Sequence, residues 1–246
     1  MTALASKNFR SNPLKAQLML GFLLLFNSCT SFEKQYVISG NTMGTTYLVK
    51  IVAPDNANDM GSIERSIDSL LIQLNKQMST WDPKSEISQF NDWNSKVPFA
   101  VSDDFLNVVR KSITISEQTG GLFDPTVYDL MSLWGFGPNP KSGFPNLEDV
   151  HRTLGHTGIS HFKTTDSELS KRNEKCKLDL NAIAKGYGVD KIFNFLNEKG
   201  FNNIFVEIGG EVKCSGKNRE NKDWSIGIEN PSGDGNYQKK ISAIIS

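Results

Sequence analysis

The amino-acid sequence predicts one α+β domain, in which a mostly antiparallel sheet is flanked by helices. The predicted strands come in runs interrupted by helices of unequal length, and this order does not suit a regularly alternating parallel sheet. No GxGxxG motif follows the first strand, which argues against a Rossmann fold. A chain of 246 residues can bury a sizeable core, in one large domain or in two small ones.

Charge and composition narrow the classes of function. Lysine plus arginine and aspartate plus glutamate balance at 27 each, so the formal net charge is zero. A balanced charge gives no electrostatic reason to expect a nucleic-acid partner. The sequence shows neither a low-complexity tract nor a fixed-period repeat, and this indicates a globular protein.

Residues 1–29 are predicted to be a signal peptide, and residues 30–246 the folded domain. A basic segment precedes the apolar stretch 18–26, which is too short to span a bilayer as a mature helix. Cys29 follows this stretch and resembles the acylated cysteine of a bacterial lipobox. A cleaved secretory signal and an uncleaved anchor stay open as alternatives. All three interpretations place the domain outside the cytoplasm.

Two strands and a long helix are expected first. Strands at residues 35–39 and 45–52 flank a small polar turn (residues 40–44) with Met43 near its centre. A methionine side chain packs well against flat aromatic systems, although in a turn it more often serves only for packing. Apolar residues at 3.6-residue spacing predict a helix that ends near residue 78, before Pro83.

Three shorter helices are expected in the middle of the chain. They cover residues 85–91, residues 103–119 after the cap Ser102, and residues 147–154 after the cap Asn146. Trp81, ahead of the first of them, is a candidate aromatic wall. Asp124 stands before a proline and could cap the segment that follows it. Three large apolar residues of that segment are expected to pack against the core: Leu133, Trp134 and Phe136.

The histidines and the last two cysteines do not suggest a metal site. His151, His156 and His161 are spaced five residues apart, which puts them on no common helical face, and we expect them at the surface. Cys176 and Cys214 lie in predicted strands. An oxidising compartment would permit a disulfide between them, but we favour two small buried apolar residues.

Residues 177–191, reading KLDLNAIAKGYGVDK, carry the pattern most suggestive of a binding site. A short strand turns into a helix at Asn181, a good N-cap residue. Such a turn presents unpaired N–H groups and the positive end of the helix dipole, which suits an anionic group. Lys185 adds a mobile positive charge, and Asp179 and Asp190 place carboxylates on either side.

Two glycines of this helix suggest that another group approaches its backbone closely. Gly186 and Gly188 weaken a helix relative to alanine, so two within three residues need a reason. An ordinary amphipathic helix with one buried apolar stripe stays open as the alternative interpretation.

The remaining strands follow from short apolar runs. They are predicted at residues 161–165, 175–180, 203–208, 211–215, 224–229 and 239–245, with a polar turn at 166–173. The third of them ends in Gly209 and Gly210. The chain stops within the last strand on apolar residues, and we therefore expect that a C-terminal part is missing.

Five of these segments, taken in order, resemble one family. They read TMGT, MSTWDPKSEIS, GLFDPTV, LDLNAIAKGYGVD and VEIGGEV. Together they resemble the ApbE-type FAD:protein FMN transferases, which are extracytoplasmic magnesium-dependent lipoproteins. The resemblance covers nearly all of residues 35–246. It implies that FAD and Mg²⁺ bind, and that FMN moves to a threonine hydroxyl of an acceptor protein with release of AMP.

The resemblance also implies roles for individual residues. Met43 would lie against the flavin ring, and Trp81 stands where the family often has tyrosine. Ala182 would offer its backbone carbonyl to the metal. The other implied contacts with the cofactor are Leu122, Phe123 and Asp124 at the adenosine part, Asp179, Lys185, and the glycines Gly209 and Gly210. The implied location is the periplasmic face of the bacterial inner membrane, reached through an N-terminal lipid anchor.

The sequence departs from the family at its end. The family continues into a Thr-Ser-Gly segment, a His…Asp-Pro-x-Thr-Gly loop and an Asp and Thr pair that completes the metal shell, and none of these is present. The general base and the other metal ligands are therefore unassigned. A shortened chain or gene model, a degenerate relative and a fragment completed by another chain are the possible explanations, and we favour the first.

On this interpretation the 246 residues alone bind FAD weakly and do not transfer FMN. An FAD pyrophosphatase, a non-catalytic FAD-binding lipoprotein and a lipoprotein interaction domain without a ligand are the alternative functions.

Overall fold

The structure is a computed structural model that describes residues 33–55, 59–230 and 241–246. The predicted signal peptide and Cys29 lie outside these residues, so both stay predictions. Within the described ranges, no helix combines the length and the apolar character that crossing a membrane requires.

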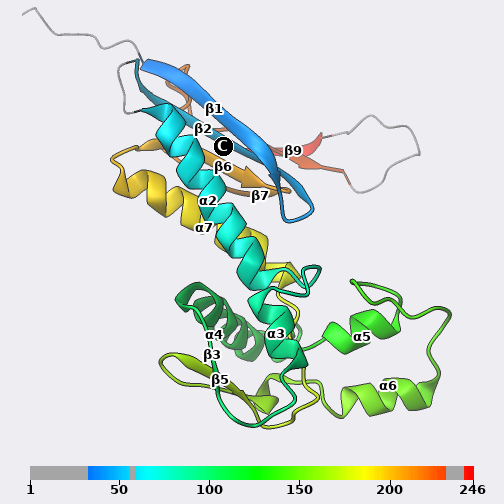
Figure 1. Ribbon diagram of the computed structural model, residues 1–246. Helices are drawn as coiled ribbons and strands as arrows, with labels where there is room; N and C mark the ends of the chain where they lie inside the picture. Colours follow the sequence, from blue (N-terminus) through cyan, green and yellow to red (C-terminus); the bar gives the residue numbers. More distant parts are fainter. Residues whose placement is uncertain (1–32, 56–58, 231–240) are drawn as a thin grey trace, which may run out of the picture.

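The larger sheet is antiparallel throughout and has the strand order β1-β2-β6-β7 (Figure 1). Its strands are β1 (Glu33–Thr42), β2 (Thr45–Pro54), β6 (Asn203–Ile208) and β7 (Glu211–Ser215). Burial alternates from residue to residue along β6, because successive side chains of a strand point to opposite faces. The predicted strands are confirmed here, and β1 and β2 are longer than predicted.

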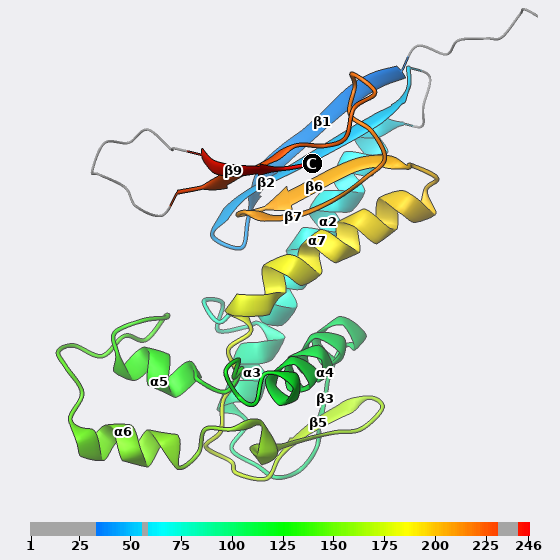
Figure 2. The same cartoon turned by 180° about the vertical axis from the view of Figure 1, so that it is seen from behind.

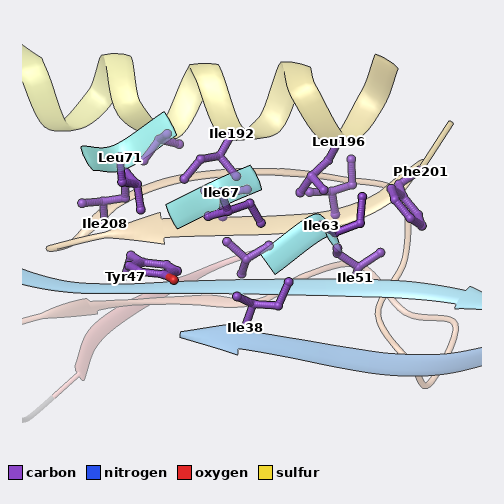
Figure 3. Close-up of a cluster of buried hydrophobic side chains, with 14 of the residues drawn as sticks. Ile38, Tyr47, Ile51, Ile63, Ile67, Leu71, Ile192, Leu196, Phe201 and Ile208 are labelled. Atoms are coloured by element: carbon purple, nitrogen blue, oxygen red, sulfur yellow. The ribbon is translucent and has the colours of Figure 1, made fainter. Parts of the chain in front are cut away.

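Two long helices, α2 (Met60–Met78) and α7 (Asn181–Glu198), cover one face of this sheet (Figures 1 and 2). Their apolar side chains meet those of the sheet in a group that we call the sheet cluster (Figure 3). Its buried members are Ile38, Tyr47, Val49, Ile51, Ala53, Ile63, Ile67, Leu71, Val189, Ile192, Leu196, Phe201, Ile204, Val206 and Ile208.

The middle of the chain forms a second half beyond the ends of α2 and α7 (Figure 2). Its helices are α3 (Glu86–Asp92), α4 (Asp103–Gln118), α5 (Tyr128–Leu133), α6 (Leu147–Leu154) and the 3₁₀ turn η1 (Ile159–His161). Its small antiparallel sheet contains β3 (Phe99–Ala100), β4 (Phe162–Thr164) and β5 (Glu168–Lys171). We call its core the helical cluster: Leu74, Met78, Ile87, Phe90, Phe105, Val108, Val109, Phe162, Leu169, Cys176, Leu178, Leu180 and Ala184.

The last two strands, β8 (Ile226–Glu229) and β9 (Ile241–Ile245), pair as a separate antiparallel hairpin. Every strand pairing in the described part of the chain is antiparallel, and helices flank the sheets. The predicted α+β class with a mostly antiparallel sheet is therefore confirmed.

The strand predicted at residues 175–180 is wrong. Leu178 bonds through both backbone groups to the side chain of Asn91, with Asn91 Nδ2 donating to its carbonyl at 2.8 Å and Asn91 Oδ1 accepting from its N–H at 2.7 Å. A side chain thus replaces the neighbouring strand that the alternating pattern had suggested. Cys176 is buried in this extended segment as a free cysteine, and Cys214 is a free cysteine in β7. The predicted polar turn at 166–173 instead contains β5.

Smaller predictions also need correction. Asp124 does not cap α5, because its Oδ1 accepts from the backbone N–H and the hydroxyl of Thr126. Trp134 and Phe136 are exposed instead of packed, whereas Leu133 is buried as expected. His156 is only 16% exposed in its side chain and lies 3.3 Å from an Asp129 carboxylate oxygen, so it is not a free surface residue.

Candidate functional site

A cavity of about 360 Å³ lies where α2 and α7 pass from the sheet cluster to the helical cluster. It is the candidate site because several residues singled out in the sequence line it together. Its lining residues are Met43, Gly44, Leu74, Asn75, Met78, Ser79, Trp81, Asn181, Ala184 and Lys185. Methionine, leucine, alanine and tryptophan supply a mainly apolar wall, and an apolar wall with a few polar groups is typical of small-molecule sites.

Met43 reaches the cavity from the tight turn between β1 and β2. The turn has two residues, Met43 and Gly44, and both have positive φ angles of 49° and 74°. Such two-residue hairpin turns normally take asparagine, aspartate or glycine, so a methionine here is strained. The turn is shorter than predicted, because residues 40–42 belong to β1.

The absence of a side chain at Gly188 leaves space beside α7 for the Met43 side chain. A Cβ atom added at Gly188 would lie 3.2 Å from Ile208 Cδ1 and 3.5 Å from Met43 Cε. A Cβ at this position would therefore be tight against the sheet at Ile208 and in ordinary contact with the methionine. By contrast, a Cβ at Gly186 would meet nothing within 4 Å. The predicted close approach is thus found at Gly188 alone, and the approaching group within the chain is the sheet.

Trp81 lines both this cavity and a second, more polar one of about 290 Å³. Its side chain is 66% exposed, which is unusual for so large an apolar group, and it leaves a flat aromatic surface open to a ligand. The residues that line the second cavity are Thr80, Trp81, Pro83, Ser88, Asn91, Asp92, Tyr128, Pro138, Asn139 and Lys177.

The first turn of α7 is held by polar contacts beside Trp81. The N-cap position is occupied by Leu180, not by Asn181 as predicted. Asp179 Oδ1 accepts a hydrogen bond from the Asn181 N–H at 2.8 Å, and Asn181 Nδ2 lies 3.4 Å from Thr80 Oγ1. A carboxylate thus stabilises the positive end of the helix dipole. The Asp179 N–H donates to the Pro125 carbonyl at 2.7 Å, which links this turn to the GLFDPTV segment.

Lys185, one turn further along α7, is paired with a residue that the sequence motifs did not single out. Its Nζ donates to Glu211 Oε1 at 2.7 Å and to Oε2 at 3.0 Å. Glu211 follows the Gly209–Gly210 turn inside the VEIGGEV segment, and this membership of the motif is the signal by which the sequence could have indicated it. Asp190, also on α7, pairs with Lys213 at 2.6 Å instead of facing the cavity.

The Gly209–Gly210 turn lies close to the hairpin that carries Met43. Gly209 has a φ of 56°, and a Cβ there would come within 2.7 Å of Thr45 Cγ2. The backbone at Gly209 thus lies against Thr45, and the contacts of Gly209 and Gly210 with the cofactor stay predictions. Gly210 has a φ of 101°, its N–H donates to Glu207 Oε1 at 2.6 Å, and a Cβ there would meet no atom within 4 Å.

The adenosine-contacting residues implied by the resemblance stand apart from the lining of both cavities. Leu122 is 93% exposed, Phe123 is half-buried, and Asp124 bonds to Thr126. Their proposed contact with a nucleotide stays a prediction. The structure therefore groups Met43, Trp81 and Lys185 around one cavity, has Asp179 bonded to the lining residue Asn181, and leaves residues 122–124 outside the lining.

The start of α7 and the residues just ahead of it offer two oxygen donors of the kind that a magnesium ion prefers. Hard cations prefer carboxylate and carbonyl oxygens, and Asp179 and the exposed Ala182 supply one of each. Within the residues that the structure describes, no group of three or more histidine, cysteine, aspartate or glutamate side chains could hold a metal ion. The donor chemistry therefore fits, and a metal ion here would keep several waters.

A buried lysine stands behind the polar cavity. Lys171 is 2% exposed, its Nζ donates to the Asn91 carbonyl at 3.0 Å, and it lies 4.8 Å from the centre of the Phe90 ring. Burial lowers the pKa of Lys171 to about 8, and burial raises the pKa of the neighbouring Cys176 thiol to about 12. Asn91 thus bonds to Lys171 and Leu178 at once, and it connects the polar cavity to the segment before α7.

Comparisons with known proteins agree on one family. The model of the ApbE family matches residues 43–246. The FAD:protein FMN transferase of Vibrio cholerae is 40% identical over 227 residues, which are 92% of this chain and 67% of that protein. The FAD:protein FMN transferase of Haemophilus influenzae is 36% identical, over 89% of this chain and 64% of that protein.

Solved structures give the same result. The flavin transferase ApbE of Vibrio cholerae matches with a TM-score of 0.79 and 40% identity, over 85% of this chain and 68% of that one. The apo form of the Pseudomonas stutzeri flavinyl transferase ApbE matches with a TM-score of 0.76 and 32% identity, over 80% and 66%. The chain spans about two thirds of the length of the relatives that it matches.

Proposed function

The chain belongs to the ApbE family, and from this premise we propose that it transfers the FMN part of FAD to an acceptor protein. In finer detail, we propose a threonine hydroxyl as the acceptor group, AMP as the leaving group and Mg²⁺ as the metal. Two observations support this proposal. Relatives that are 40% and 36% identical are named FAD:protein FMN transferase, and the residues described above line one cavity.

The cavity bounded by Met43, Trp81 and Lys185 is the observation that carries this proposal. A flavin ring is flat and largely apolar, and the thioether of Met43 and the indole of Trp81 are groups that pack well on such a ring. The phosphates of FAD are anionic, and Lys185 and the positive end of the α7 dipole are suited to them. One cavity thus offers complementary surfaces to both chemical parts of the ligand.

The proposed reaction exchanges one phosphorus–oxygen bond for another. The hydroxyl oxygen of the acceptor forms a bond to the phosphorus of the FMN phosphate, and the bond from that phosphorus to the AMP oxygen breaks. AMP leaves with the bonding electron pair, and the hydroxyl proton passes to a base. Among the described residues that line the cavity, none is a histidine, aspartate or glutamate, so the base is unassigned.

Most of the contribution of this chain is positioning and charge neutralisation. Phosphoryl transfer needs reactants in line and stabilisation of anionic oxygens more than it needs covalent help from the protein. Lys185 would bind a phosphate oxygen, and the amides at the start of α7 would orient the linkage. The Asp179 carboxylate and the Ala182 carbonyl would hold Mg²⁺, which neutralises phosphate charge when it is bound.

The acceptor protein and the cell compartment are also part of the proposal. A lipid on Cys29 would anchor the protein to the periplasmic face of the bacterial inner membrane, where a partner protein would receive the flavin. The basic and apolar pattern of residues 1–29 supports this location. No nucleic-acid partner is proposed, because the net charge is zero.

A labelling experiment with two lysine variants tests the function. The gene product at its full length is incubated with FAD, Mg²⁺ and a candidate acceptor, and covalent flavin is detected by in-gel fluorescence. Lys185→Met is expected to reduce labelling at least about 100-fold, since it removes a charge next to the reacting phosphate. Lys191→Met is the matched control. It lies on the same helix and is also ion-paired and partly buried, but it bonds to Asp104 away from the cavity.

The products separate the alternatives. Free FMN and AMP without labelled acceptor would indicate an FAD pyrophosphatase. Flavin binding without any product would indicate a non-catalytic FAD-binding protein. Equal labelling by the Lys185→Met and Lys191→Met variants would contradict the role assigned to Lys185.

A further inference from the structure

The charge of the cavity is set by a pair of residues and not by Lys185 alone. Of the described residues that line the cavity, Lys185 is the one with a charged side chain, and the Glu211 carboxylate lies against its ammonium group. Both carboxylate oxygens take part, at 2.7 Å and 3.0 Å from Nζ. The cation that should attract a phosphate is therefore already neutralised in this structure.

Burial strengthens this neutralisation. The side chains of Lys185 and Glu211 are 30% and 39% exposed, so water screens the pair less than it screens a surface ion pair. The Lys185 ammonium group lies against both oxygens of the Glu211 carboxylate. A phosphate oxygen that accepts from the same ammonium group must therefore come close to the carboxylate.

The backbones of Glu211 and Lys185 are both held by regular structure, in β7 and in α7. Glu211 is the first residue of β7 and pairs with Ile208 across the two-residue turn. That turn packs against Thr45, since a Cβ on Gly209 would overlap with it. The Glu211 carboxylate is therefore held beside the Lys185 ammonium group, where a ligand phosphate at the cavity would meet both charges.

We propose that Glu211 is a specificity-determining residue that weakens the hold of Lys185 on phosphorylated flavins. The inference rests on the proposed function, because it assumes that the cavity takes a flavin. A phosphate competes with Glu211 for Lys185 and is repelled by its charge, whereas an uncharged flavin is not affected. Glu211 thus limits the binding of the ground-state phosphate, and tight ground-state binding does not accelerate a chemical step.

Three flavins that differ in charge test the proposal. Dissociation constants for riboflavin, FMN and FAD are measured by flavin fluorescence at low ionic strength, for the wild type and for Glu211→Gln. The glutamine keeps the shape of the side chain and an oxygen acceptor, but removes the charge. We expect FMN and FAD to bind about three- to ten-fold more tightly to the variant, with riboflavin changed less than about two-fold. Adding salt to about 0.5 M should reduce the difference.

Asp190→Asn is the matched control. It removes a carboxylate that also pairs with a lysine between α7 and β7, at 2.6 Å, but Asp190 is more exposed and does not line the cavity. All three flavins should change less than about two-fold in this variant. Thermal melting of both variants checks that the fold is intact.

Two other outcomes would contradict the proposal, and they can be told apart. If Glu211→Gln leaves the ratio of FMN to riboflavin affinity unchanged, or lowers it, the role of Glu211 is wrong while the flavin cavity stands. If none of the three flavins binds to the wild type, the proposed function fails, and this proposal fails with it.

Discussion

The sheet cluster and the helical cluster are built from different kinds of residue. The sheet cluster contains apolar side chains and the ring of Tyr47, whose hydroxyl donates to Asp68 at 2.6 Å. The helical cluster encloses several buried polar groups, among them Lys171 and Asn91. Gln77 Oε1 and Ser112 Oγ, both on helices that contribute to this cluster, have no hydrogen-bond partner in the described part of the chain.

This difference indicates that the two clusters have different roles: the sheet cluster stabilises the fold, and the helical cluster also fixes the position of the candidate site. The apolar sheet cluster stabilises the packing of the sheet against α2 and α7. Because the hydrophobic effect is not directional, this cluster does not fix the conformation of the neighbouring loops. Buried polar groups cost stability unless they are paired, and they fix the segments that they bond to. Asn91 and Lys171 fix the extended segment that leads into α7, and the candidate site begins at the end of that segment.

The largest expected effect comes from breaking the polar connection of the helical cluster. Asn91→Ala leaves the N–H and the carbonyl of buried Leu178 without partners, which should cost about 3 kcal/mol of unfolding free energy. Because Asp179 follows directly, FAD affinity should also fall. Denaturant unfolding and flavin titration measure the two effects.

Ile51→Ala in the sheet cluster is the matched control. This residue is fully buried, and its truncation should also cost about 3 kcal/mol. Flavin affinity of the folded protein should stay nearly unchanged. If both variants lose affinity equally, the two clusters do not differ in their effect on the site.

A second, intermediate effect concerns the pH dependence of stability. The pKa of Lys171 is about 8 in the folded protein, against an ordinary value of 10.5 for an exposed lysine. Between these values the unfolded chain binds a proton that the folded chain does not, so this lysine's contribution to stability rises with pH. From pH 8 to 10.5 the wild type should gain about 2 to 3 kcal/mol relative to Lys171→Met.

The comparison with Lys171→Met is needed because Cys176 acts in the opposite direction. Its folded pKa of about 12 lies above the ordinary thiol value of 9.0, so its contribution to stability falls as pH rises above 9.0. Lys163→Met, at an exposed position on β4, should leave the pH dependence of unfolding unchanged. An equal slope in the wild type and in Lys171→Met would show that Lys171 is not desolvated.

The smallest expected effects distinguish the two glycines of α7. Gly186→Ala meets no neighbouring atom, so it should raise stability by about 0.5 to 1 kcal/mol through helix propensity. Gly188→Ala is tight against Ile208, which itself lies beside the cavity-lining Met43, and this should cancel that gain and weaken riboflavin binding about two- to three-fold. Melting temperatures and a riboflavin titration give the comparison. A Gly188→Ala variant as stable as Gly186→Ala would contradict the crowding at this position.

Much of the fold could be predicted because its elements have strong local patterns. In β6 the apolar residues alternate, and in α2 they recur every 3.6 residues. These patterns can be recognised in a short stretch of sequence, because the buried face of each element takes apolar residues. The segment 175–180 has the same alternation, yet its partner is the side chain of Asn91, 87 residues away from Leu178. The burial of Lys171 could not be predicted from the sequence either, because a lysine among polar residues is typical of an exposed turn.

The candidate site could be predicted only in part. Met43, Trp81 and Lys185 were singled out from the motifs, and the structure places all three around one cavity. Glu211 was missed, because its importance comes from an ion pair between α7 and β7 that no local pattern encodes. Gly188 was noticed for its cost in a helix, but the sequence could not identify Ile208 and Met43 as its neighbours.

The paths of α2 and α7 have a consequence for how a ligand enters. Both helices contribute side chains to the sheet cluster and to the helical cluster, and they contact each other. The two halves of the molecule cannot move apart as rigid bodies without bending both helices or disrupting the packing of one cluster. A ligand is therefore expected to enter from the exposed rim of the site, where Trp81 lines both cavities.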